Sequence, residues 1–204
     1  YWAGCCVTDK YVIFGKDDGK KNSESSSKII SLDKSTGKAV SSLAVKGDIR
    51  SSVVFSAETA SYYVSSKAGY VYKFSMDSSG KLGSLKTYTA PGAVTATPVV
   101  YNGRLYVGCQ NGSAGKFIVL DAKTMKEIYT ADMQGYPQAS MLISTGYEQT
   151  SGKIYIYSTY NAKPGGITAF EDSQGQTSVV KTELFTPDTD MQQYCISTVS
   201  AGED

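Results

Sequence analysis

The stretch Gly92–Gly108, with the sequence GAVTATPVVYNGRLYVG, decides how the rest of the chain can fold. Apolar and β-branched residues stand on both sides of Asn102-Gly103, a pair that typically forms the two-residue turn of a β-hairpin. The pattern predicts a short strand before this turn and a second strand after it that ends near Gly108. We therefore expect one antiparallel hairpin here.

The beginning of this stretch recurs along the chain. Gly47–Phe55 precedes it and Gly135–Ile143 follows it, so that the leading glycines lie 45 and 43 residues apart. Self-similarity at a nearly fixed period of this size is typical of repeat architectures. The chain is thus expected to be an array of one structural unit.

Each repeat contains four segments with the composition of β-strands. Short Ala/Ser-rich segments, expected to be the first strands, contain Ala3, Ser51, Ala96, Ala139 and Ser197. A second strand, a third strand, a polar turn and a fourth strand follow, as in Tyr11–Gly15, Lys28–Asp33, Lys34–Lys38 and Ala39–Val45. Four antiparallel strands in each repeat of roughly 40 to 50 residues are typical of a β-propeller blade.

We therefore predict an all-β chain, a β-propeller with about four four-stranded antiparallel blades. The predicted blades span residues 3–46, 51–90, 95–134 and 139–186, and residues 195–204 would begin a further blade. We interpret the chain as a fragment of a larger propeller of about seven or eight blades, because it starts inside a first strand and stops where a fifth unit should begin, and because the propellers that it resembles, as described below, have more blades. Two alternatives remain open: a closed four-bladed ring, and a β-sandwich, although a sandwich predicts no fixed period.

The composition excludes several classes of function. Lys and Arg number 20 against 19 Asp and Glu, so no net charge attracts the chain to nucleic acid or to an anionic membrane. No apolar run approaches the roughly 20 residues of a membrane helix, and direct membrane insertion is not expected. The absence of histidine removes Ser-His-Asp and Cys-His catalysis, and the four cysteines are too scattered for a zinc site.

The third strand and its turn carry a resemblance to a known family. Ile29–Lys38 ends in Leu-Asp-x-x-Thr-Gly-Lys, and Phe117–Lys126 repeats this phrase with Met125 in place of the glycine. The phrase resembles the pyrroloquinoline-quinone-like propeller repeats. More narrowly, five segments resemble the non-enzymatic propellers of exported Gram-positive bacterial surface proteins: Tyr1–Gly4, Gly47–Val54, Gly135–Gln138, Thr159–Gly166 and Gln192–Ser197.

The resemblance implies an extracellular or cell-surface location in a bacterium, with ligands bound at one face of the propeller. The loops that lead into the innermost strands and the loops between second and third strands share this face. Its aromatic, guanidinium and amide groups are suited to stacking on and hydrogen-bonding a sugar, peptide or small ligand; the alternative is that they only pack blade against blade. The candidate ligand-binding residues are Trp2, Arg50, Tyr136, Gln138, Tyr160, Gln192 and Tyr194.

The resemblance also raises the question of a quinone cofactor. Quinoprotein alcohol dehydrogenases, which the repeats also resemble, hold their quinone against a disulfide between adjacent cysteines, and Cys5-Cys6 is an adjacent pair. Neighbouring strand residues point to opposite faces, however, so we expect free buried thiols. The repeats also end in Ala39-Val40 and Glu127-Ile128, with aliphatic residues where the family has Trp. We therefore expect no cofactor, with quinone binding disfavoured.

Metal binding is likewise not expected. The loop Gly15–Gly19, with Asn22 and Glu24, lacks the alternating ligand order of a calcium site, and neighbouring lysines offset its charge. Cys109 and Cys195 stand near the ends of strands, and only a closed four-bladed ring would bring Cys195 close to Cys5 or Cys6.

The first functional hypothesis is a non-catalytic binding or scaffold propeller of an exported bacterial surface protein, displaying loops to a protein or carbohydrate ligand. The runner-up is a degenerate quinoprotein dehydrogenase domain. A third hypothesis is a scaffold propeller for envelope assembly. Self-association through open blade faces is also expected, because an uncovered blade exposes a large apolar surface.

Overall fold

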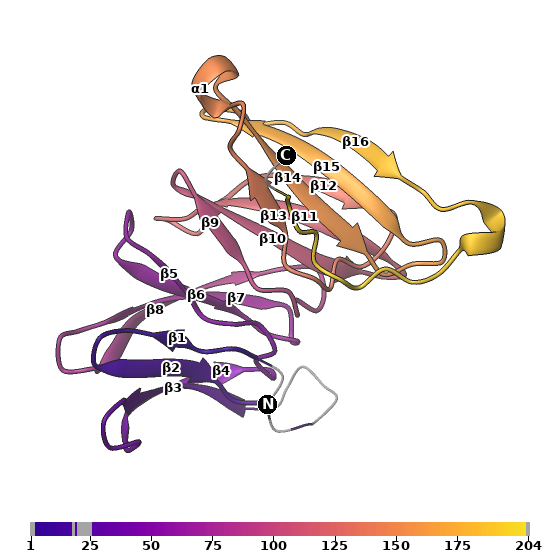
Figure 1. Ribbon diagram of the computed structural model, residues 1–204. Coiled ribbons are helices and arrows are strands. Elements are labelled where there is room, and N and C mark those ends of the chain that lie inside the picture. Colours follow the sequence, from indigo (N-terminus) through magenta and orange to yellow (C-terminus); the bar gives the residue numbers. More distant parts are fainter. Residues whose placement is uncertain (1–2, 18, 20–25, 203–204) are drawn as a thin grey trace.

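The computed structural model describes residues 3–17, 19 and 26–202, and its strands form four sheets (Figure 1). The first two sheets consist of β1 (Cys6–Val7), β2 (Tyr11–Gly15), β3 (Ser26–Asp33) and β4 (Ala39–Lys46), and of β5 (Val54–Ser56), β6 (Ser61–Ser65), β7 (Tyr70–Met76) and β8 (Leu82–Thr89). The other two consist of β9 (Val99–Tyr101), β10 (Arg104–Asn111), β11 (Ala114–Asp121) and β12 (Glu127–Met133), and of β13 (Leu142–Ser144), β14 (Lys153–Tyr160), β15 (Gly166–Ser173) and β16 (Val180–Phe185).

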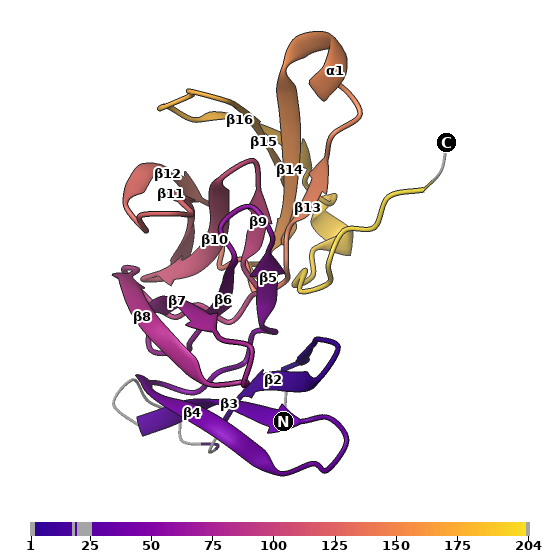
Figure 2. The same cartoon turned by 90° about the vertical axis from the view of Figure 1, so that its left-hand side faces the viewer.

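Each sheet is an antiparallel meander whose strands pair in chain order. The prediction of an all-β propeller with four four-stranded antiparallel blades is therefore confirmed. Figure 2 shows the sheets in succession from the first at the bottom to the fourth at the top. In both views the first and fourth sheets lie at opposite ends, so the described chain is an open array and not the closed four-bladed ring.

Helical structure among the described residues is limited to two short elements. Helix α1 (Glu148–Ser151) lies in the hairpin between β13 and β14, and the 3-10 helix η1 (Thr189–Met191) follows β16. Within the described part of the chain, no helix has the length and apolar character needed to cross a membrane.

The first strands begin three residues later than the repeats suggested. They start at Cys6, Val54, Val99 and Leu142. The hydroxyl of Ser51 shows why in the second blade: it donates to the Ser65 carbonyl at 3.1 Å and accepts from the Ser65 N–H at 2.8 Å. The Ser51 side chain thus bonds to the main chain of Ser65, where the main chain of a paired strand would otherwise bond. Pairing between β5 and β6 therefore starts only at Val54. The Ala/Ser-rich residues therefore belong to leading segments, residues 47–53, 90–98 and 134–141, that carry the chain into β5, β9 and β13. These are called the second, third and fourth leading segments, after the blades that they enter.

The turns between third and fourth strands follow the repeated phrase. Gly37, Gly80 and Gly175 have left-handed backbones in three of these turns, with φ of 68°, 83° and 85°. Met125 stands at the corresponding place in the third blade and also has a positive φ of 66°. The backbone conformation is thus kept where the glycine is replaced, which supports the alignment of Phe117–Lys126 with Ile29–Lys38.

The core lies between the blades, in three layers. Because successive strand residues point to opposite faces, Tyr62 packs toward the first blade and Tyr63 toward the third. Between the third and fourth blades the rings of Phe117 and Phe170 stack with centroids 4.0 Å apart. The second and third blades are covered on both faces, so the ends of their strands are rigidly packed. The loops at those ends therefore have fixed positions.

Candidate functional site

The leading segments and the hairpins between second and third strands lie on one face of the propeller, here called the leading face. Three equivalent main-chain hydrogen bonds join them: Lys67 N–H to Asp48 O (2.8 Å), Gln110 N–H to Ala93 O (2.9 Å) and Asn161 N–H to Tyr136 O (2.8 Å). Because the same hydrogen bond occurs in three successive blades, the backbone of each leading segment is held in the same way against the neighbouring hairpin. The side chains of the leading segments project from this repeated backbone arrangement.

Close packing fixes this frame further. A Cβ added to Gly15 would lie 2.0 Å from Cγ2 of Ile49, and one added to Gly108 would lie 2.5 Å from Cγ of Pro137. At these two places in the second strands only glycine leaves room for the bulky residue of the next leading segment, Ile49 or Pro137. The residues that directly follow these buried contacts are Arg50 and Gln138, so both are positioned by rigid neighbours.

Arg50, Tyr136 and Gln138 come together at one open cavity of about 460 Å³ on the leading face. These three were predicted as ligand-binding residues from the sequence. The cavity is formed by the leading segments of three successive blades and by residues at or just beyond the ends of two second strands, β6 and β10. Its full lining is Arg50, Lys67, Ala93, Thr95, Gln110, Tyr136 and Gln138.

Internal contacts orient two of the cavity's side chains. Arg50 Nε donates to Asp17 Oδ2 at 3.1 Å, and the Asp17 side chain is only 5% exposed. Burial alone would raise the pKa of Asp17, but hydrogen bonds from Gly19, Asp48 and Arg50 outweigh it and hold that pKa below its usual range. The Arg50–Asp17 contact is therefore an ion pair that directs the guanidinium.

A second internal contact connects the third and fourth leading segments. Thr95 Oγ1 and the Tyr136 hydroxyl share a hydrogen bond of 2.7 Å. Burial raises the pKa of Tyr136, so its hydroxyl stays protonated at neutral pH and acts as a hydrogen-bond donor or acceptor. The pair closes one side of the cavity with a neutral polar wall.

The other predicted site residues lie elsewhere. Trp2 lies outside the described residues. Tyr160 is fully buried between the third and fourth blades, where its hydroxyl donates to Gln134 Oε1 at 3.1 Å. Gln192 and Tyr194 belong to the segment after η1 and do not line the leading-face cavity. Burial explains the position of Tyr160: its ring is needed in the interblade layer.

The sequence reasoning did not name Lys67 and Gln110 as site residues. Lys67 lies two residues after β6 and Gln110 is the last residue but one of β10, at the place that Asn161 holds in the fourth blade. The signal was present in the strand register, since Val54 pairs with Tyr63 as Val99 pairs with Tyr106 and Leu142 with Tyr157. Counting four residues on from each partner gives Lys67, Gln110 and Asn161.

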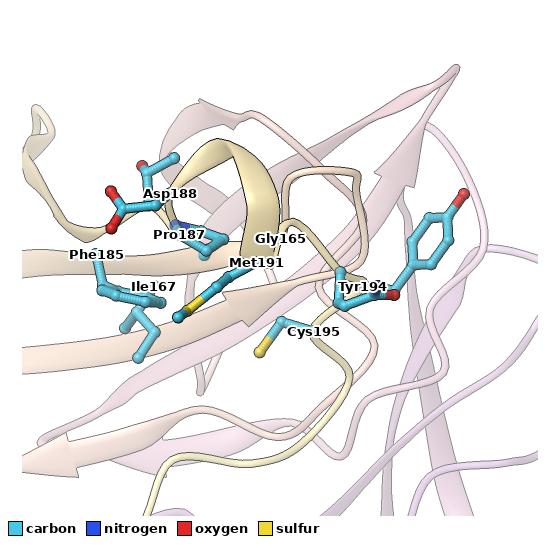
Figure 3. Close-up of a pocket in the computed structure, with 11 residues that line it drawn as sticks. Gly165, Ile167, Phe185, Pro187, Asp188, Met191, Tyr194 and Cys195 are labelled. Carbon is cyan, nitrogen blue, oxygen red and sulfur yellow. The ribbon is translucent and has the colours of Figure 1, made fainter.

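A second cavity, of about 420 Å³, lies between the fourth blade and the segment after β16 (Figure 3). Met191 points toward Ile167 and Phe185, whereas the Tyr194 ring points away from them (Figure 3). Tyr194 is 65% exposed. This cavity is largely apolar and lies on the face of the fourth blade, so it differs in kind from the polar leading-face cavity.

The segment after η1 follows the course of a leading segment. Thr159 Oγ1 donates to Ser197 O at 2.7 Å, just as Ser65 Oγ donates to Ala96 O at 2.8 Å in the second blade. Ser197 is thereby placed against the fourth blade as Ala96 is against the second, in keeping with the sequence alignment. Residues 195–202 themselves form no strand.

The cysteines are free thiols in this structure, and one prediction about them is wrong. Cys5 is exposed rather than buried, because it precedes the two-residue edge strand β1 and has no partner strand to cover it. Cys6 is half-buried, and burial, with Cys5 beside it, raises the pKa of its thiol. Burial raises the pKa of Cys109 to about 11, which makes it a poor nucleophile.

A metal centre has no support among the described residues, which contain no group of three or more His, Cys, Asp or Glu placed to hold an ion. Asp18, Asn22 and Glu24 of the acidic loop lie outside the described residues. The loop's remaining acid, Asp17, is engaged with Arg50.

Comparison with known proteins gives matches in structure alone. No family model and no curated protein sequence matches the chain. BamB from Moraxella catarrhalis matches with a TM-score of 0.55 and 16% identity, over 90% of this chain and 53% of that one. The Dos1 propeller matches with a TM-score of 0.62 and 15% identity, over 93% of this chain and 46% of that one.

A quinohemoprotein alcohol dehydrogenase from Comamonas testosteroni also matches, with a TM-score of 0.60 and 13% identity over 96% of this chain and 36% of that one. At these identities the likeness shows the fold alone, which is a β-propeller. The chain spans between about a third and about half of the length of these three structures.

Proposed function

We propose that this chain is a non-catalytic propeller module that binds a ligand in the leading-face cavity. The ligand would be a sugar or a short segment of a partner protein. In this proposal the module belongs to an exported bacterial surface protein, a placement supported only by the sequence resemblance to Gram-positive surface propellers. The runner-up, a degenerate quinoprotein dehydrogenase, rests on fold similarity and on no residue of the cavity.

The observation that carries the proposal is the convergence of Arg50, Tyr136 and Gln138 at one cavity. They come from the second and fourth leading segments, nearly ninety positions apart in the chain, yet equivalent backbone hydrogen bonds hold both segments. Rigid loops that present guanidinium, phenol and amide groups are suited to ligand recognition, since little conformational entropy is lost on binding.

The volume also suits a small ligand. An open cavity of about 460 Å³ is within the range of small-molecule sites, which hold roughly 300 to 1,000 Å³. Hydroxyl and amide groups that meet in a cavity of this size can each form hydrogen bonds to the hydroxyl or amide groups of a sugar or peptide. The aromatic ring of Tyr136 adds a surface on which a sugar ring can stack.

Glycan and peptide arrays probed with the purified protein provide the test. We expect a defined ligand group to bind, and Gln138→Ala to weaken that binding by about fivefold or more, the loss of one side-chain hydrogen bond. The matched control is Gln149→Ala in α1, an exposed glutamine on the hairpin at the opposite ends of the strands, which should bind as the wild type does.

Two results would contradict the proposal. One is binding that Gln138→Ala leaves unchanged for every ligand. The other is a quinone absorbance band and dye-linked dehydrogenase activity when pyrroloquinoline quinone and Ca²⁺ are added, which would support the enzymatic runner-up instead.

A further inference from the structure

We infer that the leading-face cavity binds its ligand through a carboxylate group. This inference rests on the proposed function, because it names the chemistry of the ligand that the same cavity would take. Its basis is the distribution of charge around the cavity. Two cationic side chains, Arg50 and Lys67, line it together with the amides of Gln110 and Gln138.

Among these groups, the Lys67 ammonium is best placed to bind a ligand, because other described residues do not engage it. Its main chain is fixed by the bond from Lys67 N–H to Asp48 O, but its ammonium group forms no hydrogen bond or ion pair with any residue in the described ranges. The Gln138 amide likewise has no hydrogen-bond partner there. By contrast, Gln110 Nε2 already donates to Gly112 O at 3.1 Å. Lys67 and Gln138 therefore offer donors that a ligand can use.

Two buried acidic side chains, Asp17 and Asp48, lie close to Arg50 but do not line the cavity. No Asp or Glu is among the described residues that line it. Asp17, which pairs with Arg50, is 5% exposed, and Asp48 is 1% exposed. Asp17 offsets the charge of Arg50, and neither carboxyl group lines the cavity. Since the whole chain carries a formal charge of only +1, the cationic lining is a local property of this site.

The donors at the cavity favour a carboxylate over a phosphate. Phosphate sites commonly use several free main-chain N–H groups at a helix N-terminus or a Gly-rich loop. Here the N–H groups of Lys67, Gln110 and Asn161 are already bonded to carbonyls of the leading segments. Recognition is left to side chains, and a guanidinium with an ammonium and an amide matches a planar carboxylate.

Two sources of a carboxylate can be separated by matched probes. The first pair is galacturonate and galactose, which differ at one carboxylate. The second pair is a tripeptide with a free C-terminus and its C-terminal amide. Binding is measured by isothermal titration calorimetry and by ligand-observed NMR, which also detects weak binding. We expect the acid of one pair to bind about tenfold more tightly than its neutral partner, as for a charge-assisted contact.

Lys67→Gln is the decisive variant, because the Lys67 ammonium forms no hydrogen bond or ion pair with another described residue that the substitution would break. It should reduce the preference for the acid by about fivefold or more, because the affinity for the acid falls by more than the affinity for the neutral partner. Lys123→Gln, an exposed lysine in the turn between β11 and β12, is the matched control and should keep the preference. Arg50→Gln is less suitable, since it would leave the buried Asp17 carboxylate without its ion pair.

The outcomes separate this inference from the proposed function. Equal binding of acid and neutral partner, or a preference that Lys67→Gln does not change, would overturn the inference, and so would a lack of binding by both acids. If neutral ligands still bound and Gln138→Ala still weakened them, the proposed function would stand alone. If Gln138→Ala changed nothing for any ligand, the proposed function would fail as well.

Discussion

Arg104 and Asp172 form a buried ion pair across the boundary between the third and fourth blades, with 2.8 Å between Nη1 and Oδ1. The Tyr106 hydroxyl donates to the other carboxylate oxygen at 2.7 Å, and Arg104 Nη2 donates to Gln176 O at 2.8 Å. In the first three blades an aspartate beside the turn after the third strand, such as Asp33, accepts hydrogen bonds from its own turn. In the fourth blade Asp172, beside the same turn, joins two blades instead.

This ion pair leads to a prediction about stability. Arg104→Met should lower the free energy of unfolding by about 3 to 5 kcal/mol, because it leaves the buried Asp172 carboxylate without its cation. The double variant Arg104→Met with Asp172→Leu should recover much of this loss, since no buried charge remains unpaired. Urea denaturation of the two variants and the wild type measures both effects. A double variant that is less stable than Arg104→Met would contradict this explanation.

Gly108→Ala tests the close contact that positions Gln138. The added Cβ would lie 2.5 Å from Pro137, so the leading segment must shift, and we expect a loss of about 1 to 3 kcal/mol together with weaker ligand binding. Gly146→Ala is the control: its Cβ would meet only Ser144 Oγ at 3.9 Å, and its stability should change by less than about 0.5 kcal/mol. Thermal denaturation and array binding provide the measurements, and equal behaviour of the two variants would refute the packing argument.

Asp33 gives a prediction about pH. The Ser35 hydroxyl and the Thr36 N–H and hydroxyl donate to its carboxylate and lower its pKa to about 2. A lowered pKa in the folded state stabilises the protein at pH values above the ordinary pKa, and this contribution is lost as the pH falls from about 4 to about 2. Asp33→Asn should therefore have a lower Tm than the wild type at pH 7, with the difference shrinking below about pH 4. A difference that stays constant down to pH 2 would show that the carboxylate charge is not involved.

At Met125, backbone strain and side-chain burial have opposite effects on stability. Its φ of 66° favours glycine, and Met125→Gly would relieve strain of about 1 kcal/mol. The side chain, however, is only 6% exposed in the layer between the second and third blades, and its loss costs about 2 kcal/mol or more. We therefore expect Met125→Gly to be less stable in urea denaturation, although the first blade has Gly37 at the corresponding place.

Ala60→Gly is the matched comparison for this prediction. Ala60 has a φ of 47° and is exposed, so strain relief acts there with little loss of packing. It should be as stable as the wild type or up to about 1 kcal/mol more stable. A stabilised Met125→Gly would mean that backbone strain outweighs burial at this turn.

Much of the fold could be predicted because its signals are local and repeated. The Asn102-Gly103 turn, the aspartate turns and the Val- and Tyr-rich strands each favour the observed element on their own, and the period aligns them. The beginning of β5 could not be predicted as well, because the hydroxyl of Ser51 bonds to the main chain of Ser65, 14 positions further along the chain, in place of a backbone partner.

The candidate site was predictable in part. Arg50, Tyr136 and Gln138 were found because they occupy leading segments, whose equivalence is visible in the repeats. Lys67 and Gln110 were missed because their importance depends on which strand ends lie beside those segments. Tyr160 had the same aromatic character as Tyr136, and only the packing of the third blade on the fourth distinguishes a buried ring from a cavity wall.

The sequence by itself determined the strand order, the turns and the four blades, because these follow from residue propensity and short-range pairing within each repeat. The tertiary structure alone decided which polar groups share a cavity and which are buried. The hydrogen bonds of Asp172 show the reason: an aspartate lies beside this turn in all four repeats, but the contacts of Asp172 depend on the side chains of the neighbouring blade. Contacts between blades depend on pairs of distant residues, and those pairs meet only when the blades pack.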